Sequence, residues 1–171
     1  MPRAAFLVRQ LGQADVSTID VIQNLFPDKQ TDFVISINET DVALIKQLPE
    51  GTGEIELDRI AAQIDEVVNS DGHVMIGIGT IANHLRDLAK SYKEAQIAIE
   101  VGKVFDTERH IINYENLGIG RLIYQLPTTL CEMFLQEVFK KNPIDALDQE
   151  TLFTIYKFLS LIHISEPTRL R

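Results

Sequence analysis

The fold is decided by residues 32–48, which read DFVISINETDVALIKQL. Two runs rich in apolar and β-branched residues, Asp32 to Asn38 and Val42 to Leu48, flank the polar segment Glu39-Thr40-Asp41. Two such runs around a short polar turn predict an antiparallel β-hairpin. A hairpin placed among alternating helices and strands is typical of α+β domains and differs from strict βαβ repetition.

One strand and one helix are predicted before the hairpin. Ala4 to Val8 is a short, continuous apolar run, which favours a strand that is buried on both faces. Apolar residues recur at a three-residue interval between Asp15 and Phe26, and Pro27 follows. This rhythm, closed by a proline, predicts a short helix.

After the hairpin, the chain returns to a helix and then a strand. The segment EGTGE at residues 50–54 is a glycine-bearing loop. The helix after it carries one apolar stripe, made of Leu57, Ile60, Ala61, Ile64, Val67 and Val68. Asn69 to Gly72 supplies the stop signals, and Gly72 suits the left-handed position after a helix end. His73 to Ile78 is a further apolar strand.

A longer helix and a final strand complete the pattern. The apolar face of this helix comprises Leu85, Leu88, Tyr92, Ala95 and Ile99. Asn83 is predicted to cap its start, and Lys103 lies near its end, where the helix dipole favours a cation. His110 to Tyr114 is predicted as a strand.

The order is therefore β, α, β-hairpin, α, β, α, β over residues 1–117. We predict an α+β sheet domain with a ferredoxin-like core and one additional strand. Residues 118–159 form a helical module, with apolar spacing at Leu130, Met133, Phe134 and Val138 and again at Leu152, Ile155, Tyr156 and Leu159. Asn142-Pro143 separates the two helices. Residues 160–171, SLIHISEPTRLR, do not continue the pattern, and we expect a non-native tail of adaptor or vector origin.

Composition narrows the function classes. The chain has 171 residues, a net charge of −9 and a single cysteine, Cys131, so an internal disulfide is excluded. No apolar run reaches the roughly 18 residues of a membrane span, and the start lacks the apolar core of a signal peptide, so we expect a cytoplasmic protein. Residues 1–117 hold 10 Lys or Arg against 19 Asp or Glu, and residues 118–171 hold 6 of each. Neither part is basic, which argues against DNA binding by this polypeptide.

The first candidate site is the glycine turn at Gly77-Ile78-Gly79-Thr80-Ile81-Ala82. It fits the G-x-G-x-x-A dinucleotide pattern and lies between a strand and a helix. The acidic residue that binds ribose is expected about 20 residues on, but the nearest candidate, Glu115, lies 33 residues beyond Ala82. We therefore interpret the glycines as positions where the strand ends and the helix approaches closely.

The second candidate is the acidic turn that contains Glu39 and Asp41. In the nucleotide-cyclase fold, such a turn lies beside the first strand, and carboxylates from both places hold magnesium ions. Here the first strand, Phe6 to Leu11, contains no Asp or Glu. Half of the metal site is absent, and a solvated turn is the favoured interpretation.

The remaining reactive residues carry little signal. His73, His84 and His110 lie near element boundaries without a partner at metal-ligand spacing, so surface or capping roles are predicted. Cys131 lies in an amphipathic helix and is predicted to be a small buried residue. No catalytic, cofactor-binding, metal-binding or DNA-binding residue is predicted in this chain.

Several stretches together resemble the "GiG … SYxEA … yedLGl" signature of the CdaR/PucR family of sugar-diacid and purine-catabolism transcriptional regulators. They are Gly77-Ile78-Gly79, Leu85-Arg86-Asp87-Leu88, Ser91-Tyr92-Lys93-Glu94-Ala95 and Asn113-Tyr114-Glu115-Asn116-Leu117-Gly118. Two later stretches, Arg121-Leu122-Ile123 and Leu147-Asp148-Gln149-Glu150-Thr151-Leu152, resemble that family's linker and the first helix of its C-terminal DNA-binding domain. The resemblance covers about residues 3–159.

The resemblance implies a degenerate GGDEF-like domain, related in fold to nucleotide cyclases, followed by the start of a C-terminal helix-turn-helix domain. It implies a non-catalytic signalling and dimerisation role, with DNA contacted only through the missing C-terminal helices. We expect no cofactor and a homodimer, with contacts on the helix from Leu85 to Lys103 and on the helices after Gly118. Exposed apolar side chains are expected at Phe134, Phe139, Phe153 and Tyr156. The alternative is a nucleotide-binding or nucleotide-cyclase enzyme of the GGDEF type, and a sensor that uses the glycine turn is a third hypothesis.

Overall fold

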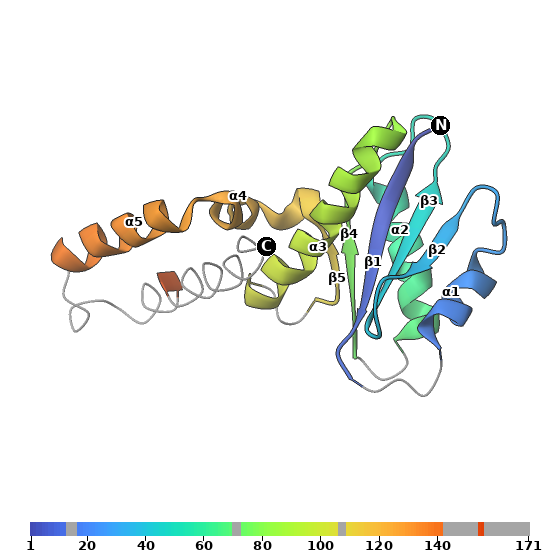
Figure 1. The fold of residues 1–171 in the computed structure, drawn as a ribbon, viewed down its shortest axis with the longest axis horizontal. Coiled ribbons are helices and arrows are strands. Elements are labelled where there is room, and N and C mark those ends of the chain that lie inside the picture. Colours follow the sequence, from blue (N-terminus) through green and yellow to red (C-terminus); the bar gives the residue numbers. More distant parts are fainter. Residues whose placement is uncertain (13–16, 70–72, 106–108, 142–153, 156–171) are drawn as a thin grey trace.

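A computed structural model describes residues 1–12, 17–69, 73–105, 109–141 and 154–155. Five strands form one mixed sheet in the order β2-β3-β1-β4-β5 (Figure 1). They are β1 (Arg3–Gln10), β2 (Phe33–Ser36), β3 (Asp41–Gln47), β4 (Val74–Ile78) and β5 (Ile111–Asn113). All neighbouring strands are antiparallel except β4 and β5, which are parallel. The predicted hairpin is confirmed, with Phe33 opposite Ile45.

Helices cover both faces of this sheet. The helical elements are α1 (Thr18–Leu25), α2 (Glu54–Val68), the 3-10 turn η1 (Leu85–Asp87), α3 (Leu88–Phe105), the 3-10 turn η2 (Tyr114–Leu117), α4 (Ile119–Gln125) and α5 (Thr128–Lys141). One apolar cluster joins α1 and α2 to the sheet, and a second joins α3 to the opposite face. The predicted α+β class is therefore confirmed, and the structure shows in addition that helices lie on both faces of the sheet.

Strand β1 shows why a continuous apolar run is needed at the centre of the sheet. Ala4 to Val8 are all fully buried. Since side chains alternate along a strand, Phe6 enters the cluster below α1 and α2, whereas Leu7 enters the cluster below α3. The prediction of a strand buried on both faces is confirmed.

The start of the long helix differs from the prediction. Leu85–Asp87 form a 3-10 turn, closed by a 3.0 Å bond from the Asp87 N–H to the His84 carbonyl, and α3 begins only at Leu88. Asn83 is therefore not the cap, and Leu85 is 70% exposed instead of lying on the buried stripe. Ala82 is still held against Arg3 of β1 by an antiparallel bridge, so the helix can begin only after the chain has left the sheet.

The helical part begins after Gly118, which has a φ of +55°. Ile123 and Tyr124 of α4 pack against the apolar cluster under α3, and α5 then extends away from the sheet (Figure 1). The predicted helix through Leu130 and Phe134 is confirmed as α5, and Phe134 is 58% exposed as expected.

Some predictions fall outside the described residues. They concern the Gly72 cap, the Asn142-Pro143 break, the side chains of Phe139, Phe153 and Tyr156, the 160–171 tail and most of the second helix of the 118–159 module. Among the helices that are described, none has both the length and the apolar character required to cross a membrane.

Candidate functional site

The two candidate sites lie at opposite ends of the sheet. Strand β1 runs antiparallel to both β3 and β4. The acidic turn lies beside the end of β1, where Arg9 is opposite Asp41. The glycine turn lies beside its start, where the Gly79 N–H donates to the Ala5 carbonyl at 2.9 Å. We call these the hairpin end and the glycine end.

At the glycine end, the glycines allow α3 to lie directly on β4. A Cβ atom at Gly77 would lie 2.1 Å from the Ala95 carbonyl oxygen, and one at Gly79 would lie 1.9 Å from the Ser91 carbonyl oxygen. Both contacts are with backbone, which cannot move aside. The interpretation of these glycines as close-approach positions is confirmed by this geometry.

Two polar residues of the S-Y-x-E-A stretch fasten the same turn. The Ser91 hydroxyl accepts from the Ala5 N–H at 3.0 Å and donates to the Thr80 carbonyl at 2.7 Å. The Glu94 carboxylate accepts from the Thr80 N–H at 3.1 Å and from the Thr80 hydroxyl. Ser91 and Glu94 are 1% and 6% exposed. A buried carboxylate therefore occupies the backbone donor that a phosphate group would need.

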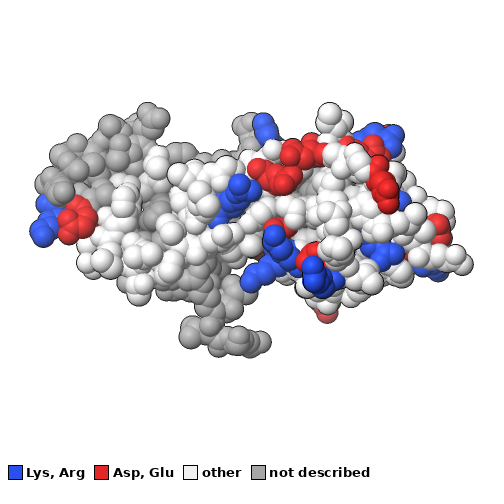
Figure 2. Space-filling view, turned by 90° about the horizontal axis from the view of Figure 1, so that it is seen from above, with Lys and Arg blue, Asp and Glu red and all other residues white. Residues whose placement is uncertain are grey.

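Further carboxylates surround the glycine end. Burial raises the pKa of Glu115 above its ordinary value, and a hydrogen bond with Glu54 and the charges of Glu54 and Glu94 raise it further. Figure 2, which views the molecule from above, shows Asp and Glu side chains gathered over one part of the surface and Lys and Arg side chains over another. Since like charges repel, Glu54, Glu94 and Glu115 oppose the binding of an anionic dinucleotide at the turn.

At the hairpin end, a guanidinium joins three elements. Arg9 Nε and Nη2 donate to the two carboxylate oxygens of Asp41 at 2.9 and 2.8 Å. Arg9 Nη1 donates to Glu100 Oε1 of α3. The side chains of Arg9 and Asp41 are 18% and 5% exposed. This bidentate pair, with a second carboxylate, ties β1 to β3 and to α3.

Electrostatics at the hairpin end follow from this pairing. Burial alone would raise the pKa of Asp41, but hydrogen bonds and charge from Arg9, with bonds from Thr40 and Asn38, hold it below its ordinary value. Hydrogen bonding to Asp41 raises the pKa of Arg9, burial opposes that rise, and Glu100 adds to it. Both groups are charged at neutral pH.

The prediction of a solvated turn is half wrong. Glu39 is exposed as predicted, but Asp41 is 4% exposed and is the first residue of β3. The side-chain oxygen of Asn38, Oδ1, accepts hydrogen bonds from the Thr40 and Asp41 N–H groups at 2.8 Å each. These bonds shape the turn and direct Asp41 inward. The prediction failed because the partner of Asp41 lies 32 residues earlier.

These residues do not fit a divalent cation. A magnesium site of the cyclase type needs free carboxylate oxygens from both the turn and the first strand. Here both oxygens of Asp41 are engaged by Arg9, and β1 contributes a cation at that place instead of an anion. Within the described ranges, there is also no group of three His, Cys, Asp or Glu residues placed to hold a metal ion.

The predicted surface positions of the histidines are confirmed. His73, His84 and His110 are all exposed, and His110 Nε2 lies 4.0 Å from Asp65 Oδ2. The Cys131 side chain is outside the described part of α5.

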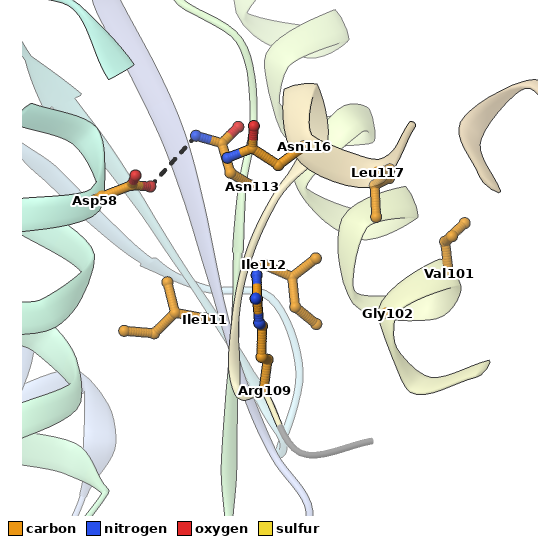
Figure 3. Close-up of a pocket in the computed structure, with 9 residues that line it drawn as sticks. All are labelled: Asp58, Val101, Gly102, Arg109, Ile111, Ile112, Asn113, Asn116 and Leu117. Carbon is orange, nitrogen blue, oxygen red and sulfur yellow. Dashed lines mark hydrogen bonds between the residues drawn. The ribbon is translucent and has the colours of Figure 1, made fainter. Parts of the chain in front are cut away.

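A pocket of about 340 Å³ lies beside β5, between α2 and α3 (Figure 3). Asp58, Asn113 and Asn116 line its polar part, and Ile112 and Val101 are among its apolar residues. Asn113 Nδ2 donates to Asp58 Oδ1 at 3.4 Å, and Asn113 Oδ1 accepts from the Glu115 N–H at 3.1 Å. The buried amide of this pocket is thus already bonded within the protein.

Residues 1–101 match the GGDEF-like domain family. The match extends from β1 into the second half of α3 and includes both ends of the sheet. Because it covers more than half of the 171 residues, the chain belongs to the GGDEF-like domain family. No curated protein matches the sequence. The GGDEF-like part of the resemblance is therefore confirmed.

The sequence predicted where the two sites lie but not which residues fill them. Ser91 and Glu94 were visible only as part of the family signature, and Glu100 carried no signal. One signal was present at the hairpin end. Arg9 directly follows the buried run Ala4 to Val8, and a cation next to a buried strand is stabilised by a nearby carboxylate.

Proposed function

We propose that this chain is a non-catalytic signalling and dimerisation domain of a bacterial transcriptional regulator of the CdaR/PucR type. In this proposal, the GGDEF-like domain at residues 1–117 holds two copies together in the cytoplasm, and DNA is contacted only by a C-terminal helix-turn-helix domain that begins within residues 118–159. Dimers suit this role because helix-turn-helix proteins bind paired half-sites at a fixed spacing.

The single observation that carries the proposal is the Arg9–Asp41 pair. Its bidentate bonds of 2.9 and 2.8 Å occupy the carboxylate at the position where a cyclase would bind metal. A phosphoryl-transfer enzyme needs such metal ions to neutralise the charge that develops on the phosphates. A guanidinium from β1 in that place supports a domain that acts without this catalytic apparatus.

Two further observations support the finer parts of the proposal. Gly79 lies closely against Ser91, and Ser91 and Glu94 bond to Ala5 and Thr80 beside it, so the CdaR/PucR-like motif has a structural role that needs no catalysis. A ferredoxin-like core is supported by the strand order β2-β3-β1-β4 with antiparallel neighbours, and by α1 and α2 on one face. In this assignment β5 is the additional strand.

The test is a direct assay for nucleotide turnover. The purified chain is incubated with GTP or ATP and Mg²⁺ or Mn²⁺, and the products are separated by chromatography, beside an Asp41→Ala variant. We expect no cyclic or dinucleotide product from either protein. Turnover by the unmodified chain that disappears in Asp41→Ala would refute the non-catalytic role and establish the cyclase alternative.

A further inference from the structure

An apolar strip lies along one outer edge of the sheet. Phe33, Ile35 and Ile37 are 42%, 47% and 44% exposed. They alternate along β2 and its continuation into the hairpin turn, so they share one face, whereas Val34 between them packs into the α1–α2 cluster. We call these three residues the β2 strip. Three large apolar side chains on one short strand form a patch that soluble proteins normally cover.

The helices of the described chain leave this strip open. The helix on that face, α3, packs on β1, β4 and β5, which lie toward the opposite edge of the sheet from β2 (Figure 1). The contact described on the strip is Arg3, whose guanidinium carbon lies 5.6 Å from the centre of the Phe33 ring. The strip therefore keeps its apolar area toward solvent in a single copy of the chain.

The strand also presents an edge without charged side chains. In the order β2-β3-β1-β4-β5, β2 is a terminal strand with one unpaired side. Proteins usually protect such edges with charged residues, proline, a bulge or a very short strand; Phe33–Ser36 is four residues long, and its sequence FVIS contains no charged residue and no proline. An edge of this kind pairs readily with another strand through its backbone groups.

The apolar residues of the β2 strip can pair with those of a second copy of the same strip. If two β2 strands pair antiparallel about Ile35, that residue faces its own counterpart, and Phe33 of each copy faces Ile37 of the other. Exposed charges lie beyond the two ends of the strip, Asp28 and Lys29 on one side and Glu39 on the other, and neither Lys29 nor Glu39 forms a salt bridge within the described residues. A two-fold axis at Ile35 brings each lysine toward the glutamate of the other copy. A parallel partner strand would instead place like charges together.

We propose that two copies of this chain form a two-fold dimer by antiparallel pairing of their β2 edges, which joins the two sheets into one of ten strands. This inference rests on the proposed dimerisation role and specifies its interface. It differs from the surfaces expected from the sequence: the outer face of α3 carries the 75% exposed side chain of Lys90, which suits solvent better than a dimer contact. The apolar face of α4 and α5 is followed by residues 142–153 and 156–171, outside the described ranges, whereas both flanks of the β2 strip are described.

The experiment measures molar mass by sedimentation over a range of protein concentrations. We expect the unmodified chain to approach twice 19.3 kDa. Ile35→Lys places two like charges opposite each other at the axis, and we expect it to raise the dimer dissociation constant at least about 100-fold. Because Ile35 is 47% exposed, the fold should persist, which circular dichroism checks. The matched control is Ile55→Lys on α2, where the residue is 88% exposed and the dimer should be unaffected.

A charge exchange tests the orientation of the two strands. Glu39→Lys is expected to weaken the dimer by several-fold, and the double variant Lys29→Glu with Glu39→Lys is expected to restore it. A chain that remains a monomer over a 100-fold increase in concentration would overturn the dimerisation role together with the interface, whereas a dimer unaffected by Ile35→Lys would overturn the interface alone. Neither result bears on catalysis, whereas nucleotide turnover by an intact β2 dimer would refute only the non-catalytic role.

Discussion

At the hairpin end and at the glycine end of the sheet, side chains of opposite charge are bonded to polar groups of the chain. At the hairpin end, a protein cation, Arg9, occupies the carboxylate that could bind a metal ion. At the glycine end, a protein anion, Glu94, occupies the backbone N–H of Thr80 that could bind a phosphate. In each case, a charged side chain of the chain itself is bonded to the polar group at that end of the sheet. The comparison teaches that a cation and an anion can each satisfy one end of the same sheet from within the chain.

The two ends differ in what holds them. The glycine end depends on the distance between two backbones, whereas the hairpin end depends on attraction between charges. Substitutions of Gly77 or Gly79 should therefore cost more and respond little to pH and salt, while substitutions of Arg9 or Asp41 should respond to both. The following predictions test this difference, from the largest effect to the smallest.

The largest loss is expected for Gly79→Val. Its Cβ would overlap the Ser91 carbonyl oxygen at 1.9 Å, so α3 must move away from β4 and leave the core poorly packed. We expect the free energy of unfolding in urea to fall by about 3 kcal/mol or more. The control is Gly53→Val, since a Cβ at Gly53 meets nothing within 4 Å and its φ of −107° suits any residue. A similar loss in both variants would contradict the close-approach interpretation.

Arg9→Ala should be the next most damaging change. It leaves the buried carboxylate of Asp41 and the carboxylate of Glu100 without their shared cation. We expect a loss of about 2–3 kcal/mol in the free energy of unfolding, below the value for a fully buried pair because Arg9 is partly exposed. Arg59→Ala is the matched control: its pair with Glu56 has a 65% exposed arginine side chain, and the loss should be under about 0.5 kcal/mol. Equal losses in the two variants would show that the hairpin end is an ordinary surface ion pair.

Ser91→Ala should cost about 1–2 kcal/mol. It removes the acceptor of the Ala5 N–H and the donor to the Thr80 carbonyl, and both groups are left without these partners at a buried position. Chemical denaturation measures the loss, and hydrogen exchange at Ala5 should accelerate. Ser36→Ala, which removes an exposed hydroxyl bonded to the Asn38 carbonyl, serves as the control with an effect near zero. Unchanged exchange at Ala5 would contradict the role of this hydroxyl.

The smallest effect is a dependence on pH at the hairpin end. Because the pKa of Asp41 is lowered in the folded state, its contribution to stability is complete above the unfolded-state pKa of about 3.9 and is lost as pH falls through the folded value. We expect the stability difference between the unmodified chain and Asp41→Asn to shrink by about 1 kcal/mol between pH 5 and pH 2. Urea titrations at each pH measure it. A difference that is constant over this range would mean that Asp41 is not stabilised as a carboxylate.

The order of strands and helices could be predicted because each element carries its own periodic signal. The apolar run at Ala4 to Val8 and the two runs around the acidic turn depend on neighbours in sequence, and all were confirmed. The prediction that the long α-helix includes Leu85 was wrong, because apolar spacing alone does not distinguish a 3-10 turn from the first turn of an α-helix.

The contents of the two sites could not be predicted, since they join residues far apart in the chain. Arg9 meets Asp41 across 32 residues and Glu100 across 91. Nothing local to Asp41 distinguishes it from the exposed Glu39 two positions earlier. The glycine turn was the more predictable site because Gly77 and Gly79 have few structural reasons to occur between a strand and a helix, and close packing is one of them.

Gly118 sets the direction in which α4 leaves the turn η2. Its φ of +55° is a conformation that residues with a side chain rarely adopt, and it stands between η2 and α4. Since α5 alone spans 14 residues, or about 20 Å at 1.5 Å per residue, a rotation of roughly 20° at this pivot swings its far end by several ångströms. The direction of α5 therefore depends on two places in the backbone, Gly118 before α4 and the extended residue Leu126 between α4 and α5.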